Sequence, residues 1–208
     1  MIKTEFVTEY PIREMWQSAQ ATMGKEVTAY PKNIFAFARN MLVAEHSLLG
    51  IPVLKITDTE CRSDVISHLV RHTHGRPRHF VQSKRPDWTG EERPKDPAAP
   101  RIYVSYWPID AFMYMARQRL CLRAMAETNK WVKDVRKALS CTIGNADQIT
   151  LAMALAEVMV PPCVYRSGCG EGIKTCGLWD KIHKDYTKLS PRDRYFLYYY
   201  GEVQRESV

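Results

Sequence analysis

Segments with strand composition are few and short in this chain, whereas segments with helical periodicity are long. Residues 53–57 and 102–107 are rich in β-branched or aromatic residues, and Phe80-Val81 is a candidate strand fragment. Apolar residues recur at helical spacing in residues 30–50, 58–72, 108–120, 128–139 and 148–160. These patterns indicate a chain of mixed helix and strand.

The composition is that of an ordinary globular protein. Of the 208 residues, 45% are hydrophobic and 25% are charged, which disfavours disordered, collagen-like and coiled-coil structures. We predict a single domain over residues 1–208, in which residues 161–208 form a Cys-containing, Tyr-rich C-terminal extension. No stretch approaches the roughly 20 apolar residues of a membrane helix, and the first residues are charged and polar. We therefore expect a soluble, cytoplasmic protein with no membrane partner.

Positive charge is concentrated in residues 71–85, which we call the basic segment. The net charge of +7 favours an anionic partner. The basic segment holds five Lys or Arg among its fifteen residues, and three of the six histidines. We interpret it either as a phosphate or nucleotide site or as a solvated basic loop. A nucleic-acid-binding module that uses residues 71–93 is a third interpretation, which the scarcity of stacking side chains there (Phe80 and Trp88) disfavours.

Three motifs follow one another between residues 44 and 177. They are His46-Ser47 with Ser67-His68-Leu69-Val70-Arg71-His72 and Gln82-Ser83-Lys84-Arg85; Arg119-Leu120-Cys121-x-x-Ala124-x-x-Glu127; and Val160-Pro161-Pro162-Cys163 with Cys169-x-Glu171-Gly172 and Cys176-Gly177. In this order they resemble the flavin-dependent thymidylate synthases, whose signature is Arg-His-Arg, a short loop and Ser-x-Arg.

The resemblance implies an α+β fold in which helices pack on a small, mainly antiparallel sheet. It also implies conversion of dUMP to dTMP, with methylenetetrahydrofolate as the carbon source and NADPH as the reductant of FAD. A homotetramer with FAD shared between subunits is expected as well.

Site residues carry over from the motifs one by one. The resemblance assigns catalysis to Ser83, Arg85 and Arg119. It assigns cofactor binding to Arg71 and His72, with His46 and Arg78 as further candidates. It assigns dUMP binding to Ser83, Arg85 and Arg119, and Arg123 is a further candidate there. An arginine beside the uracil carbonyls would favour the enolate-like base formed during attack.

The chain also departs from the family pattern. Thr73 replaces the last arginine of Arg-His-Arg, the loop before Ser83 is two residues longer, and Asn129 stands where the helix motif has an arginine. Nucleotide binding would then shift to Arg123, Arg76 or Arg78. An alternative is therefore a family variant that makes a modified pyrimidine nucleotide, for example by 5-hydroxymethylation.

Three of the six cysteines lie close together near the C-terminus. Cys163, Cys169 and Cys176, with Cys121 as a fourth partner, have thiolate ligands for Zn²⁺ or an iron–sulfur cluster. Their spacing lacks the tight C-x2-C pair of common zinc sites, so small buried thiols where the C-terminal segment packs are the alternative.

Overall fold

Four antiparallel strands form the sheet of this protein. The computed structural model describes residues 1–83, 85–90, 96, 98–170 and 175–200. The strands are β1 (Ile2–Phe6), β2 (Val53–Arg62), β3 (Arg78–Val81) and β4 (Pro100–Pro108), in the spatial order β1-β2-β4-β3. The predicted α+β class with a small antiparallel sheet is confirmed.

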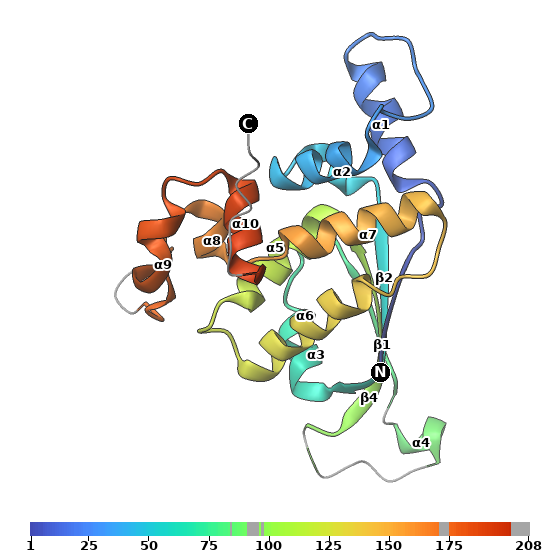
Figure 1. Ribbon diagram of the computed structural model, residues 1–208. Helices are drawn as coiled ribbons and strands as arrows, with labels where there is room; N and C mark the ends of the chain where they lie inside the picture. Colours follow the sequence, from blue (N-terminus) through green and yellow to red (C-terminus); the bar gives the residue numbers. More distant parts are fainter. Residues whose placement is uncertain (84, 91–95, 97, 171–174, 201–208) are drawn as a thin grey trace.

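The two faces of the sheet differ in their surroundings. Alternate residues of β2 and β4, including Leu54, Ile56, Tyr103 and Trp107, are fully buried, as the two-residue period of a strand requires. Figure 1 shows α5 (Ile109–Leu120), α6 (Ala126–Leu139) and α7 (Ala146–Val158) on that side of the sheet. We call the opposite side, which carries Val104, the outer face.

The remaining helices are shorter and lie around this core. They are α1 (Pro11–Thr22), α2 (Ile34–Val43), η1 (Ser47–Gly50), α3 (Ser63–Leu69), α4 (Pro86–Thr89), α8 (Pro162–Arg166), α9 (Leu178–Tyr186) and α10 (Pro191–Tyr200). No helix among the described residues is long and apolar enough to cross a membrane.

The structure corrects several predicted boundaries. The helix expected from residue 58 begins only at Ser63, because β2 continues to Arg62 and pairs there with Pro100. The helix expected over residues 30–50 is two elements, α2 and η1, and Asn33 caps the first by accepting the Ala36 N–H at 2.9 Å. The strand β1 and the helix α1 had no counterpart in the sequence prediction.

The C-terminal extension docks on the body of the chain. Tyr186 and Tyr195 are almost fully buried and belong to the same hydrophobic cluster as the sheet. The guanidinium of buried Arg117, on α5, lies 3.7 Å from the centre of the Tyr165 ring and pairs with Glu45. A cation held against an aromatic ring in this way fixes α8 to α5.

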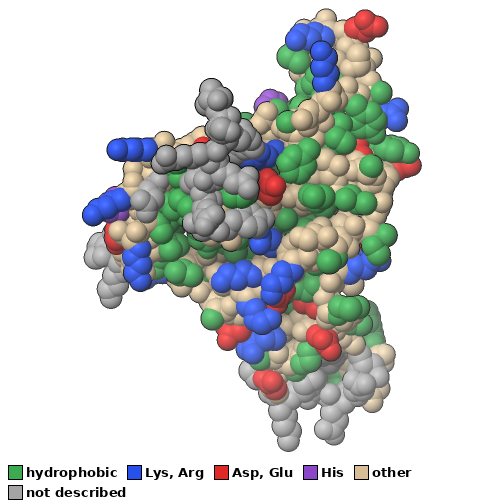
Figure 2. Space-filling model, viewed as in Figure 1, with side chains coloured by type: hydrophobic (Ala, Val, Ile, Leu, Met, Phe, Trp, Pro, Cys, Tyr) green, Lys and Arg blue, Asp and Glu red, His purple; other side chains and the backbone are tan. Residues whose placement is uncertain are grey.

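Positive charge is not confined to the basic segment. Figure 2 shows Lys and Arg side chains gathered over α6, a helix whose sequence includes Lys130, Lys133, Arg136 and Lys137. Asp134 pairs with two of these lysines. Positively charged side chains therefore gather in at least two regions of the chain, the basic segment and α6.

Candidate functional site

A cavity of about 640 Å³ lies between the start of the basic segment and the end of α5. We call it the arginine pocket. Its lining residues are Arg71, His72, Thr73, His74, Tyr114, Gln118, Arg119, Cys121, Arg123 and Ala124. Three of these are arginines and none is a carboxylate, so the pocket has the charge of an anion site.

Arg119 and His72 form the centre of the pocket. The Nε–H of Arg119 donates to Nε2 of His72 at 2.9 Å, and its Nη2 donates to the carbonyl oxygen of His68 at 3.4 Å. Burial, and after it the charge of Arg119, lower the pKa of His72 to about 4. His72 is therefore neutral near pH 7, and because Nε2 accepts, its proton is on Nδ1.

Burial also lowers the pKa of Arg119, and the nearby positive charge of Arg71 adds to this effect. Two guanidinium groups that repel each other in a partly buried pocket are stabilised when an anion binds between them. The arrangement therefore favours a ligand with a phosphate or another negative group.

Asn129 positions the end of α5. Its side-chain amide donates to the carbonyl oxygens of Arg119 at 2.9 Å and Cys121 at 3.4 Å. These carbonyls lie at the end of the helix, where no further turn supplies donors. Asn129, which stands where the family motif has an arginine, thus caps the turn that carries Arg119.

Tyr114 and Gln118 were not predicted as site residues. They lie four residues apart on α5, so they share one helix face, and both are exposed on a helix whose other residues are mostly buried. The ring of Tyr114 lies 5.3 Å from that of His74. The sequence signal that could have identified this wall is a tyrosine and a glutamine, four residues apart, just before a motif arginine in a largely apolar helix.

Ser83 and Arg85 do not line the arginine pocket. They follow β3, at the edge of the sheet; Ser83 Oγ accepts the Arg85 N–H at 3.1 Å, and Arg85 pairs with Asp87 at 2.8 Å. Lys84 of this motif lies outside the described residues, as does Arg93. The structure thus brings Arg71, His72, Arg119 and Arg123 together in one chain but places Ser83 and Arg85 elsewhere.

Two further candidates for cofactor binding also lie away from the pocket. His46 is exposed and caps η1, where its Nδ1 accepts the Leu48 N–H at 3.3 Å. Arg78 lines a second cavity of about 700 Å³ on the outer face of the sheet, together with Arg76. We call this second cavity the outer pocket.

The four candidate metal ligands lie near one another. Burial, and after it the charges of Cys176, Cys169 and Cys121, raise the pKa of the Cys163 thiol to about 11. In the described part of the chain, however, no three His, Cys, Asp or Glu side chains converge on a point where they could hold a metal ion. Glu171 and Gly172 of this motif lie outside that part. The metal site stays a prediction, which zinc and iron analysis of the purified protein tests.

The fold is similar to that of a nucleotide methylase of known structure. The UMP/dUMP methylase PolB from Streptomyces cacaoi, bound with 5-Br dUMP, matches with a TM-score of 0.52 and 11% sequence identity over 73% of this chain and 94% of that chain. A second structure, of PolB bound with 5-Br UMP, has a TM-score of 0.48 and 9% identity over 75% and 95% of the two chains. No family model and no curated protein matches the chain. The likeness shows a shared fold.

A glycine controls the turn between the two pockets. Gly75 has a φ of +68°, and a Cβ there would lie 2.6 Å from the Ala111 Cβ on α5. We expect Gly75→Ala to lower the free energy of unfolding by about 2–3 kcal/mol, from backbone strain and overpacking together. Gly90→Ala is the matched control, because Gly90 has a φ of +69° and an added Cβ would meet no atom of the described residues within 4 Å; it should cost about 1 kcal/mol. Urea denaturation measures both; equal losses would contradict the close contact at Gly75.

The state of His72 gives a dependence of stability on pH. Its pKa is about 4 in the folded chain against 6.5 for an ordinary histidine. Between these values the unfolded chain takes up a proton that the folded chain does not, so the folded state loses stability as the pH falls from 6.5 towards 4. Between pH 7 and pH 5 we expect the free energy of unfolding of the wild type to fall by on the order of 1 kcal/mol more than that of His72→Gln, allowing for solvent screening. Equal losses in urea denaturation of the two proteins would exclude a neutral, buried His72.

Proposed function

We propose that the chain is a pyrimidine-nucleotide methylase that acts on dUMP. The observation that carries this proposal is the arginine pocket, in which three arginines and a neutral histidine gather without a carboxylate. A nucleotide monophosphate supplies negative charge, and none of the described lining residues carries any. The shared fold with a UMP/dUMP methylase supports the same substrate class.

Each residue of the pocket has a distinct role in this proposal. Arg123 binds phosphate oxygens of the nucleotide, for which the planar guanidinium is suited. Arg119 is held by His72 and by the cap from Asn129. Placed against a carbonyl oxygen of the uracil, it stabilises the enolate-like base whose C5 attacks the one-carbon unit. His72 contributes an Nδ1–H donor and, being neutral, does not repel Arg119.

We further propose that FAD is the cofactor and that methylenetetrahydrofolate and NADPH are the co-substrates. The family motifs support this, and the pocket fits the charged part of the cofactor, since Arg71 and His72 offer donors to a pyrophosphate. When bound and reduced by NADPH, the flavin would supply the hydride that reduces the transferred carbon. The protein binds and orients the nucleotide.

A second copy of the chain completes the site in this proposal. Ser83 and Arg85 match the dUMP-binding motif, yet in one chain they are at the sheet edge, away from Arg119. A homotetramer in which the sheet edge of one subunit faces the arginine pocket of another would unite them. This proposal explains why both sets of residues match motifs of one family.

Spectroscopy and binding test the proposal. Purified protein incubated with FAD should show flavin absorbance, and it should bind dUMP with an affinity that falls in Arg123→Gln. Protein that binds no FAD, but binds DNA tightly and with strong salt dependence, would instead support the nucleic-acid-binding interpretation of the basic segment.

A further inference from the structure

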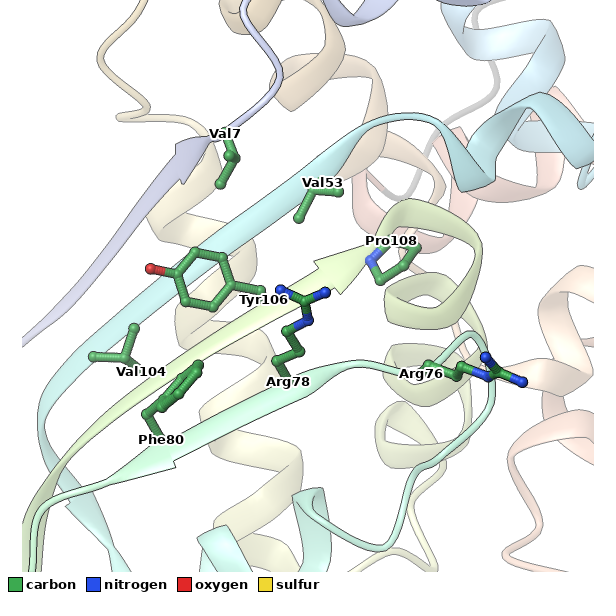
Figure 3. A pocket seen from close by; sticks show the side chains of 8 residues that line it. All are labelled: Val7, Val53, Arg76, Arg78, Phe80, Val104, Tyr106 and Pro108. Atoms are coloured by element: carbon green, nitrogen blue, oxygen red, sulfur yellow. The ribbon is translucent and has the colours of Figure 1, made fainter.

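The outer pocket has an apolar floor built from the strands of the sheet. Its lining residues are Val7, Val53, Arg76, Arg78, Phe80, Val104, Tyr106 and Pro108. Figure 3 shows the labelled side chains of the strand residues on one side of the sheet. The register places Val53 opposite Pro108, and Phe80 opposite Val104, so these side chains share one face. A twisted sheet face of this kind offers a broad apolar surface to a ligand.

Two aromatic rings give the floor a preference for flat molecules. The rings of Phe80 and Tyr106 meet edge to face with their centres 5.9 Å apart. Phe80 is 56% exposed, so its ring is accessible to a ligand. A planar ring system gains both apolar burial and ring–ring contact on such a surface.

Arg78 and Arg76 add positive charge to this apolar cavity. Arg78 stands opposite Tyr106 in the β3–β4 register, and Figure 3 shows it beside that ring, with Arg76 on the adjoining turn. Glu5, a carboxylate on β1, has a lowered pKa because it bonds with Lys55 and Lys3. No described carboxylate pairs with either arginine of the outer pocket, so their charge is available to a ligand.

The turn that carries Arg76 is held in a strained conformation. Arg76 has a φ of +53°, which is rare for a residue with a side chain. It follows Gly75, which packs directly on Ala111 of α5. Such strain persists only where the surroundings fix it, and it is concentrated at ligand-binding segments. The position of Arg76 at the end of the apolar floor is therefore fixed by the fold.

We propose that the outer pocket binds a flat aromatic molecule that carries a phosphate or carboxylate group. The rings pack on Phe80 and Tyr106, and the anionic group pairs with Arg78, while Arg76 adds positive charge at the end of the floor. The cavity of about 700 Å³ is in the range of small-molecule sites. This site is separate from the arginine pocket, and binding there is independent of the proposed methylation.

Fluorescence titration with 1-anilinonaphthalene-8-sulfonate, an aromatic anion, tests the proposal on the full-length protein. Arg78→Gln should weaken binding of this probe roughly tenfold, because a charge-assisted hydrogen bond is lost. Val53→Trp should also weaken it by filling the floor. Arg123→Gln is the matched control in the arginine pocket and should leave the affinity unchanged. N-phenyl-1-naphthylamine, a neutral analogue, should bind Arg78→Gln and wild type equally.

Competition then separates the two sources of the anionic group. Displacement of the probe by AMP would identify a phosphate ligand, and displacement by 1-naphthoate a carboxylate ligand; inorganic phosphate alone should displace it poorly. Circular dichroism confirms that each variant is folded. Unchanged probe affinity in folded Arg78→Gln and Val53→Trp would overturn the proposal. So would sedimentation data showing that the outer face is buried between two copies, with Val53→Trp dissociating them.

Discussion

Replacing Arg119 with alanine should lower kcat/KM for dUMP by a factor of about 100 to 1000. A preorganised donor to developing charge contributes about 3–4 kcal/mol to transition-state stabilisation, which corresponds to this factor. The variant also leaves His72 without the Nε–H that it accepts at 2.9 Å. Steady-state kinetics with dUMP measures the loss.

The fold should survive this substitution, because Arg119 is only partly buried and its backbone carbonyl still accepts from Asn129. Arg62→Ala is the matched control. Arg62 is exposed, pairs with Asp64 and lines neither pocket, so its loss should leave kcat/KM within twofold of wild type. A folded Arg119→Ala protein with wild-type kinetics would remove Arg119 from the site.

Arg85→Ala should also lower turnover about 100-fold, and mixing it with Arg119→Ala should restore activity. Each variant is defective in one of two places that lie apart in a single chain. If two copies form each site, a mixed oligomer contains some sites with both native arginines. Subunit exchange followed by an activity assay measures the recovery, which should approach a quarter of wild-type activity in a random mixture.

The control for this experiment is Ser83→Ala mixed with Arg85→Ala. These two residues follow the same strand and are in direct contact. Every subunit in this mixture therefore lacks one of the two native side chains, and no activity should return. Recovery in this control, or no recovery in the first mixture, would contradict a site shared between subunits.

The class of fold could be predicted because the strongest patterns are local. The apolar period of α5, α6 and α7 and the composition of β4 are visible in the chain. The extent of β2 could not be predicted, since residues 58–62 are polar or charged except for Cys61 and are extended only because β4 pairs with them. The same holds for β1, which is stabilised by its pairing with β2.

The site could be predicted only in part. Arg71, His72, Arg119 and Arg123 come from two motifs about fifty residues apart, and the structure unites them. Asn129 was recognised as a departure, but its role as a cap depends on where α6 crosses the end of α5. The positions of His46 and Arg78 depend on tertiary packing, so motif spacing alone could not place them.

Methylation of dUMP is tested by product analysis. Purified protein is incubated with dUMP, methylenetetrahydrofolate, NADPH and FAD, and the nucleotides are identified by mass spectrometry. We expect dTMP in the wild-type reaction, dependence of its formation on FAD, and a loss of at least 100-fold in Arg119→Ala. Formation of a 5-hydroxymethylated nucleotide would support the same site with a different one-carbon product. Recovery of only unmodified dUMP from flavin-loaded protein would contradict the methylation of dUMP.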